Sequence, residues 1–542
     1  MKHYSAIAIF AILFFTSFGA NANELHYSVD LRDCRLHLVH ILLKPEGFVG
    51  KRAAIFEMPV WAPGAYSVSH YGHYVVNFRA LDKHGKPLPV TQINDDRWNI
   101  PNARALATIE YDVLDSHKDS TSLYFAMANM DTSLFFANAT ALFGYFDDDK
   151  TAPATITYEK RADWKLDCAL PPSKSGYLQD TNSTFQNTNF YAKNYDVLAD
   201  APVIASPTLT TRSFREGNAI YDLVVASDDP FDDPKMDSLS LYLRKVVYAE
   251  TDFFHDTPFD HYSFILYAPT PTHLPSFAEG ALEHANSSDY MLVNLDWTLF
   301  KRVYLSIFSH EFFHLWNVKR IHSSLLGPFD YTQRVMTTSL WMAEGITEYY
   351  AHTLLSRYEI EPPENFYNDI EQWAAEYAHA TAAQKSESLE QLSIDESDFH
   401  LDNAELFYIK GPLVGWMLDL EIRNKTNNKK SLDDVMLALN ADAKRGKTFA
   451  EDNLIHVVEQ YAGVDLTDFY DRYIHGTDSL PIDRYLAFMG LRKGGKSEGK
   501  ASLGLTSDGR LFLQSLDTNT AFARAGMKPG DALIAINGTK LS

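Results

Sequence analysis

The first third of the chain alternates apolar and polar residues in short segments separated by turns. Segments such as "LHYSVDL", "AAIFEMPVW" and "YVVNFRAL" have the two-residue period of half-buried strands. Turn residues such as Pro63-Gly64 lie between them. This pattern predicts an N-terminal antiparallel β domain over residues 23–211.

From about residue 214 the pattern changes to strands followed by longer helical segments. "YSFILYA" and "DYMLVNL" have the composition of buried strands. Helical periodicity follows over 338–358, 363–383, 405–425 and 431–440. A polar linker over 493–500 and a strand-rich end over 501–542 complete the chain. We therefore expect a multidomain α+β protein whose second domain, 212–492, is mainly helical in its later part.

The stretch "SHEFFHLWNVKR" places two histidines in the most apolar of the predicted helices. Between Tyr304 and Val318 apolar residues cover most of the helix circumference, with no Gly or Pro. His310 and His314 fall one turn apart on one face, so both imidazoles can bind one zinc ion at about 2.0–2.1 Å. Glu311 lies beside them, where it could take a proton from a metal-bound water. The alternative is that one or both histidines are core residues with satisfied hydrogen bonds.

A metal held by two histidines needs a third ligand, which a later helix can supply. "TTSLWMAEGITEYYAHTLL" carries Glu344 and Glu348 one turn apart. A glutamate on a buried, aromatic-rich helix is costly unless it is paired, protonated or bound to metal. These carboxylates therefore favour the metal site.

Length and charge narrow the possible functions. A chain of 542 residues is too long for one core, so about three domains are expected. The formal net charge of −23, with no run of Lys and Arg, disfavours nucleic acid as a partner. Cys34 and Cys168 could form a disulfide in an oxidising compartment, but the sequence does not show that they meet.

The N-terminus has the layout of a secretory signal. Lys2 precedes an apolar run over 6–18, and Ala20-Asn21-Ala22 matches a cleavage site. We expect residues 1–22 to be removed and the mature chain to be periplasmic or secreted. The alternative is an uncleaved anchor, but the run is short for a span of about 20 residues and no second run follows. No stable membrane span is therefore expected after cleavage.

Three motifs, in this order, carry a resemblance to a known family. "HEFFHLWNVKRI", "LGPFDY" and "LWMAEGITEYY" resemble the glycyl aminopeptidase family, exported gluzincins related to leukotriene hydrolase and aminopeptidase N. The resemblance implies a thermolysin-like catalytic domain with one Zn²⁺ per chain on His310, His314 and Glu344, and Glu311 as the catalytic base. Glu344 follows His314 at a longer distance along the chain than the ligand glutamate does in the larger group. The sequence between them is similar to that of the glycyl branch.

Two further motifs imply substrate contacts. "FAEGALEHANS" resembles the G-x-x-E exopeptidase motif, which implies that Glu283 binds the free α-amino group of the substrate. His284 stands where aminopeptidase N usually has asparagine. "LFYIKGPLVGWML" resembles the Tyr-x-Lys-Gly motif, which implies that Tyr408 donates a hydrogen bond to the oxyanion. From the residues alone, Glu283 would be a solvated acidic residue and Tyr408 a core aromatic.

The resemblance extends along the chain. "MPVWAPGAYSVSHYGHYVVNF" is similar to the family's N-terminal domain, and "FYDRYIHGTDSLPIDRYLAFMGL" is similar to the end of its catalytic domain. Residues 501–542 resemble the first half of a PDZ domain, which would bind C-terminal peptides beside Leu503-Gly504-Leu505. We expect this PDZ domain to be partial, because the helical wall of its groove would follow Ser542.

The favoured hypothesis is an exported zinc aminopeptidase. The family implies peptide substrates with a free N-terminus, with N-terminal glycine removed first and alanine next. One alternative is a zinc endopeptidase that uses the same metal site without Glu283. The other is a non-catalytic, PDZ-containing protein that binds peptides. The metal ligands, base and tyrosine together favour the enzyme, because a binding protein would not need them.

Overall fold

The computed structural model describes most of the chain, in two compact units. The first unit is 1–240, 257–294 and 325–335, and the second is 241–256, 295–324 and 336–542. The predicted signal segment 1–22 and most of the predicted linker lie outside the described residues. Those residues are 24–46, 52–116, 126–173, 185–272, 279–293, 295, 300–394, 401–493, 505–507, 512–516, 521–532, 534–536 and 539–540.

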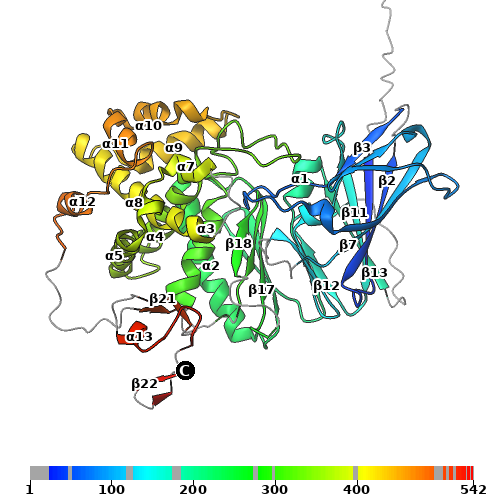
Figure 1. Ribbon diagram of the computed structural model, residues 1–542, viewed down its shortest axis with the longest axis horizontal. Coiled ribbons are helices and arrows are strands. Elements are labelled where there is room, and N and C mark those ends of the chain that lie inside the picture. The colour runs from blue at the N-terminus through cyan, green and yellow to red at the C-terminus, as the bar shows by residue number, and fades with distance from the viewer. Residues whose placement is uncertain are drawn as a thin grey trace, which may run out of the picture. The chain divides into compact units, whose positions relative to one another are not determined.

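A six-stranded sheet organises the N-terminal part of the first unit (Figure 1). Every second residue of its strand β1 is buried, as the alternating sequence pattern predicts. The strands lie in the order β13 (Phe185–Ala192), β11 (Ala154–Arg161), β1 (Glu24–Leu31), β2 (Leu38–Glu46), β7 (Leu106–Leu114) and β4 (Val75–Asp82).

One strand pair differs from the expected antiparallel domain. β1 pairs with β11 in parallel, whereas the other pairs of this sheet are antiparallel. Parallel neighbours need a long crossover, and residues 32–153 supply it. Local alternation predicts strands but not the direction of their partners, so the prediction of a purely antiparallel domain is wrong at this pair.

Two smaller sheets and one short helix complete the N-terminal part of this unit. Phe56, Phe78 and Trp98 pack in its core, with Phe78 stacked on Trp98 at 4.8 Å between ring centroids. The elements are β10 (Tyr145–Phe146), β3 (Ala54–Glu57), β6 (Arg97–Ile100) and β5 (Thr91–Asn94), then β12 (Lys165–Cys168), β14 (Val203–Ser206), β9 (Phe135–Ala137) and β8 (Ala128–Met130), and α1 (Tyr195–Ala199).

A five-stranded mixed sheet also belongs to the first unit. Its order is β15 (Thr210–Glu216), β16 (Ala219–Ser227), β17 (His261–Ala268), β19 (Ser287–Met291) and β18 (Gly280–Glu283). β16, β17 and β19 are parallel, and β18 is an antiparallel edge strand. All of β17 after its first residue is buried, which explains why "YSFILYA" is apolar apart from Ser263.

The second unit is built from helices, as the periodicity predicts. Figure 1 shows α4, α8, α9 and α10 packed together. Ser431 and Asp434 form a capping box at the start of α9, and Gly463 ends α10 in the left-handed conformation. Helix α2 (Asp233–Phe254) belongs to this unit only from residue 241 onward. The other helices are α3 (Leu305–Phe313), α4 (Thr347–Arg357), α5 (Pro363–His379), α6 (Ala382–Lys385), α7 (Leu389–Ile394), α8 (Leu401–Lys425), α9 (Leu432–Ala443), α10 (Leu454–Ala462), α11 (Thr467–Tyr473) and α12 (Ile482–Phe488).

The C-terminal end has short strands where the sequence predicts a partial PDZ domain. Strand β20 (Leu505–Ser507) pairs with β21 (Leu513–Leu516), helix α13 (Ala521–Arg524) follows, and β22 (Ala535–Ile536) pairs with β23 (Thr539–Lys540). Leu503 and Gly504, in the predicted peptide-binding loop, lie outside the described residues. The PDZ assignment therefore stays a prediction.

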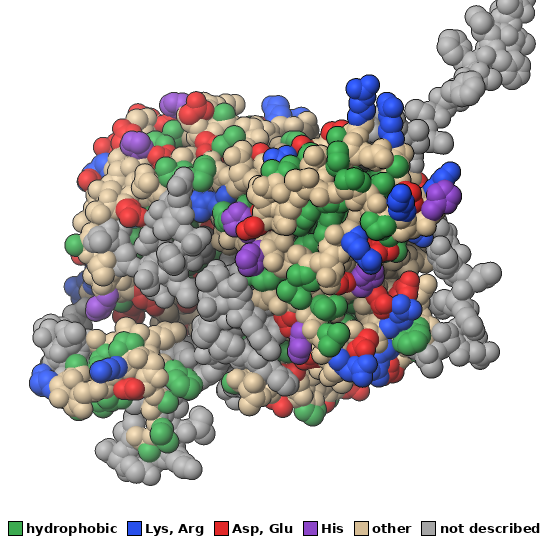
Figure 2. Space-filling view, turned by 45° about the vertical axis from the view of Figure 1, so that its right-hand side comes forward, with side chains coloured by type: hydrophobic (Ala, Val, Ile, Leu, Met, Phe, Trp, Pro, Cys, Tyr) green, Lys and Arg blue, Asp and Glu red, His purple; other side chains and the backbone are tan. Residues whose placement is uncertain are grey.

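Surface charge and hydropathy add two observations. On the face drawn in Figure 2, Lys and Arg side chains are interspersed with Asp and Glu side chains, so the acidic excess is not one continuous patch there. Among the described helices, none is both long and apolar enough to cross a membrane.

Candidate metal centre

Two histidines and one glutamate of the second unit converge on one point. The Nε2 atoms of His310 and His314 lie 2.9 Å apart, and Oε2 of Glu344 lies 3.2 and 3.4 Å from them. Each of these three residues is at most 5% exposed. Two imidazoles and a carboxylate are a donor set typical of catalytic zinc. Because three buried donor atoms face one another, the residues fit a zinc ion.

The outer nitrogens of both histidines have acceptors that set the tautomer. Nδ1 of His310 donates to Oε2 of Glu348 at 2.7 Å, and Nδ1 of His314 donates to the carbonyl oxygen of Asn317 at 2.8 Å. With the proton on Nδ1, the lone pair of each Nε2 is available to a metal. Glu348 therefore supports His310 and is not itself one of the converging ligands.

Asn317 joins the histidine helix to the segment that carries Glu344. Its side-chain amide donates to the carbonyl oxygen of Met342 at 2.7 Å and to the hydroxyl of Thr347 at 3.0 Å. α3 ends at Phe313, and the chain turns so that Asn317 can reach these groups. The predicted helix to Val318 is thus too long, because tertiary contacts outweigh local periodicity. No local pattern in the sequence predicts this role for Asn317.

Two glycines bring Tyr408 close to the metal ligands. Glu344 lies in the π-helical segment η7 (Trp341–Ile346), a geometry often found at functional sites. A Cβ on Gly345 would lie 2.6 Å from Cα of Gly411, so η7 and α8 touch through their backbones. Tyr408 lies three residues before Gly411 on α8, about one helical turn away. The contact between Gly345 and Gly411 therefore places Tyr408 beside Glu344.

The hydroxyl of Tyr408 is aimed at the site. It donates to Oε2 of Glu344 at 3.1 Å, the same oxygen that faces both histidines. Although 36% of Tyr408 is exposed, desolvation of its hydroxyl and the negative charges of Glu344 and Glu311 raise the pKa of this tyrosine above its usual range. The tyrosine therefore keeps its proton at neutral pH and can act as a hydrogen-bond donor.

The ligand glutamate is held in its charged form. Burial by itself would raise the pKa of Glu344, but the nearby His314 and His310 outweigh burial and lower it. The candidate base Glu311 is also buried, at 8% exposure, and follows His310 directly on α3. An ionised carboxylate is the form that binds a metal.

Comparison with known proteins agrees with this geometry. Residues 26–207 match the family model for the Peptidase M61 N-terminal domain, and residues 303–429 match the model for M61 glycyl aminopeptidase. The chain carries two M61 peptidase domains. The resemblance to glycyl aminopeptidases is thereby confirmed at the level of these domains. No curated protein matches the chain.

Solved structures share the fold of these M61 domains. An aminopeptidase N family protein from Idiomarina loihiensis has 23% identity and a TM-score of 0.78, over 95% of this chain and 90% of that chain. An M1 zinc metallopeptidase from Deinococcus radiodurans has 14% identity and a TM-score of 0.51, over 85% of this chain and 94% of that chain. The β-rich N-terminal part and the helical C-terminal part are confirmed by this shared fold.

The candidate amine-binding residue of the M61 chain, Glu283, lies in the first unit. It ends the edge strand β18 and is 3% exposed. Gly64 has φ +95°, and a Cβ built there would lie 2.6 Å from Oε2 of Glu283. The carboxylate is thus packed against glycine backbone, an approach that only glycine allows. This contact explains Gly64 in "WAPGAY", which the sequence showed only as a turn.

The neighbouring His284 is held between two carboxylates in the first unit. Its Nδ1 lies 3.0 Å from Asp200 and its Nε2 lies 3.1 Å from Asp289. Burial would lower the pKa of His284, but these two hydrogen bonds outweigh it and raise the pKa to about 9. The protonated ring therefore ties the turn after β18 to the residue after α1.

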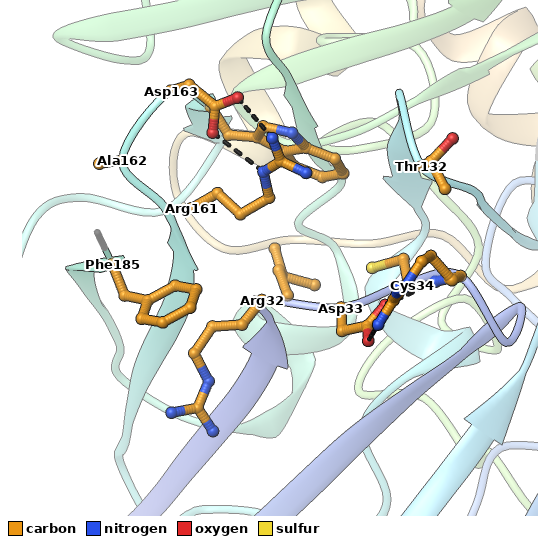
Figure 3. Close-up of a pocket in the computed structure, with 11 residues that line it drawn as sticks. Arg32, Asp33, Cys34, Thr132, Arg161, Ala162, Asp163 and Phe185 are labelled. Carbon is orange, nitrogen blue, oxygen red and sulfur yellow. Dashed lines mark hydrogen bonds and ion pairs between the residues drawn. The ribbon is translucent and has the colours of Figure 1, made fainter.

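A separate pocket of about 790 Å³ lies among the N-terminal strands (Figure 3). Arg35 pairs with Asp33, and Arg161 pairs with Asp163, each within 2.7 Å. Cys34 in its wall is a free thiol, and burial raises its pKa to about 12, so it stays protonated at neutral pH. None of the proposed site residues lines this pocket. The lining residues are Leu31, Arg32, Asp33, Cys34, Arg35, Thr132, Arg161, Ala162, Asp163, Trp164 and Phe185.

Proposed function

We propose that this protein is a zinc aminopeptidase that uses His310, His314 and Glu344 as metal ligands. One observation carries the proposal: Oε2 of Glu344 faces both histidine Nε2 atoms and also accepts the hydrogen bond of Tyr408. The M61 domain matches support a metallopeptidase independently of this geometry. We expect one zinc ion per chain.

A zinc ion held by His310, His314 and Glu344 would act as a Lewis acid, which would lower the pKa of a water molecule and polarise a peptide carbonyl. Glu311, next to His310 on α3, accepts a proton from the attacking water. It then delivers that proton to the amine that leaves. Tyr408, which stays protonated, donates its hydrogen bond to the oxygen that gains negative charge as the carbonyl is attacked.

Glu283 is proposed to bind the free α-ammonium group of the substrate. Its burial against Gly64 supports a fixed carboxylate with little surrounding water. Blocking the amine would remove the positive charge that this carboxylate is proposed to bind, and loss of one partner of such a buried charge pair costs roughly 2–5 kcal/mol. The enzyme would then cut only the first peptide bond of a chain with a free N-terminus.

A preference for glycine, and next alanine, follows from the family assignment. It requires a first pocket that is filled by protein atoms. Exclusion by steric clash discriminates more strongly than contact does, since each buried methylene contributes only about 1–3 kcal/mol. N-terminal glycine would then be removed faster than any larger residue.

The experiment measures zinc content by mass spectrometry and turnover of glycyl, alanyl, leucyl and N-acetylglycyl amides. We expect one zinc per chain, fastest cleavage of the glycyl amide, and cleavage of the acetylated amide slower by at least tenfold. Fastest cleavage of the leucyl amide would overturn the glycine preference. Equal rates for the acetylated and free amides would favour a zinc endopeptidase. Absence of both zinc and turnover would favour a peptide-binding protein.

Export and a second peptide site are further parts of the proposal. Lys2, the apolar run over 6–18 and Ala20-Asn21-Ala22 support a signal that is cleaved after Ala22. Residues 501–542 would bind C-terminal peptides as a PDZ domain does. The intact mass of protein from the cell exterior or periplasm tests the first point, with a new N-terminus at Asn23 as the expected result.

A further inference from the structure

A chain of hydrogen bonds leads away from the metal centre through α4 and α5. Oε2 of Glu348 accepts from Nδ1 of His310 at 2.7 Å. Its other oxygen, Oε1, accepts from Nε2 of His352 at 3.1 Å, and Nδ1 of His352 donates to Asp369 at 2.7 Å. Each oxygen of the Glu348 carboxylate is therefore held by a different histidine.

The ring of His352 has no freedom to turn without losing a contact. Both of its nitrogens face carboxylates, so both donate and the ring is an imidazolium. Burial alone would lower the pKa of His352, but the hydrogen bonds to Asp369 and Glu348 raise it to about 10. Trp373, one helical turn after Asp369, packs edge to face on the ring at 5.0 Å. Two residues of α5 therefore hold the ring, Asp369 by a hydrogen bond and Trp373 by packing.

We propose that His352 is a positioning residue for the metal centre. It holds the Glu348 carboxylate in the orientation that keeps Nδ1 of His310 protonated and its Nε2 aimed at the metal. Asp369 accepts a hydrogen bond from the nitrogen of His352 that does not contact Glu348, so it acts on the metal site only through His352. The inference rests on the proposed metal ligands, but not on the substrate or on Glu283.

Carboxylate partners of ligand histidines fix ring orientation, and their loss typically reduces metal affinity or activity by 10–100-fold. Without His352, the Glu348 carboxylate would keep one anchor and could rotate about its last bond. The ring of His310 would then be less firmly oriented, and its Nε2 would point at the metal for only part of the time. The loss should be smaller than that on removal of Glu348 itself, because His352 acts only through Glu348.

The test measures the zinc dissociation constant of the full chain by competition with a coloured chelator. We expect His352→Gln to weaken zinc binding by about tenfold, and Asp369→Asn by less. Glu376→Gln is the matched control, since Glu376 lies on α5 and its side chain contacts exposed Gln372. The control should bind zinc as the unaltered protein does.

A second readout uses cobalt in place of zinc, because its visible spectrum reports ligand geometry directly. His352→Gln should change this spectrum, whereas Glu376→Gln should leave it unchanged. In a Glu348→Ala background, His352→Gln should cause no further loss of zinc affinity if the two act in series. Additive losses would assign His352 to the α4–α5 contact alone.

The outcomes separate this inference from the proposed function. If the unaltered protein binds no zinc, the metal centre itself is wrong. If it binds zinc and both His352→Gln and Asp369→Asn match it in affinity and cobalt spectrum, only the role of His352 is overturned. Should His352→Gln fail to fold, Asp369→Asn, which keeps both helices and the ring, carries the test.

Discussion

At the scale of single residues, the decisive feature is which ring nitrogen of each histidine is already hydrogen-bonded to another residue. His310 and His314 share a helical face, which two core histidines could also do. Their Nδ1 atoms are taken by Glu348 and by the Asn317 carbonyl, which leaves both Nε2 atoms facing Glu344. This arrangement supports the proposed metal site over two histidines that are only core residues.

Glu311→Gln should keep zinc and lose activity. The substitution removes the proposed proton acceptor, but Glu311 is not one of the three residues that meet at Oε2 of Glu344. Zinc content by mass spectrometry and turnover of a glycyl amide are the measurements. Loss of the metal, or turnover close to that of the unaltered enzyme, would contradict the assigned role.

Tyr408→Phe should lower kcat by on the order of 10²–10³ and leave KM nearly unchanged. The ring stays, while the hydroxyl that meets Glu344 is removed. Steady-state kinetics on a glycyl amide give both constants. A kcat near that of the unaltered enzyme would show that the hydroxyl does not meet the oxyanion.

Glu344→Ala should lose zinc more completely than Glu348→Ala. Glu344 faces both Nε2 atoms, whereas Glu348 reaches the site only through His310. Zinc retained after dialysis is compared for both variants, with Glu376→Gln alongside. The reverse order would mean that the ligand lies one turn farther along the helix.

At the scale of elements, the backbone contact between η7 and α8 sets the distance from Tyr408 to the ligands. Cβ atoms built on Gly345 and Gly411 would lie 2.6 and 2.7 Å from the opposite Cα. Real Cβ atoms do not come so close, so either side chain would force the two elements apart. Close packing against Gly345 thus explains why the Tyr-x-Lys-Gly motif has a glycine at Gly411.

Gly411→Ala should destabilise the second unit by about 1–3 kcal/mol and lower kcat, because overpacking moves α8 and Tyr408 away from Glu344. Gly415→Ala on the same helix is the control. Its Cβ would lie 3.1 Å from Cδ1 of Ile346 and from Cβ of Tyr349, a tight contact with side chains but wider than the 2.7 Å backbone clash at Gly411. Urea unfolding and kinetics are measured on both. Equal effects for the two would refute the backbone argument.

At the scale of the whole molecule, all three proposed metal ligands belong to one compact unit. His310, His314 and Glu344 lie in the second unit, while Glu283 lies in the first. A ligand that binds only the folded state stabilises the part of the chain that holds it. Zinc should therefore affect the two units unequally.

We compare the protein at a free zinc concentration about a thousandfold above the dissociation constant with the protein after removal of zinc by a chelator. The removal should lower the free energy of unfolding of the second unit by about 4 kcal/mol. Scanning calorimetry with and without chelator checks this, and Glu344→Ala should show no such shift. If the thermogram resolves two transitions, only one should move. Equal movement of both would show that the units unfold together.

The sequence by itself determined the features that depend on neighbours along the chain. Alternation predicted the strands of the first unit, and the three-to-four-residue period predicted α4, α5, α8 and α9. The four-residue spacing of His310 and His314 placed both rings on one face, because a helix returns to the same side each turn. The motifs then named Glu344 and Tyr408 as partners.

Tertiary structure alone decided what depends on distant segments. The parallel pairing of β1 with β11, the early end of α3 at Phe313 and the approach of Gly64 to Glu283 leave no local period in the sequence. The same is true of the contact between His352 and Asp369, which lie on different helices. Such contacts are chosen by the packing of whole elements, where burial and hydrogen bonding outweigh local propensity.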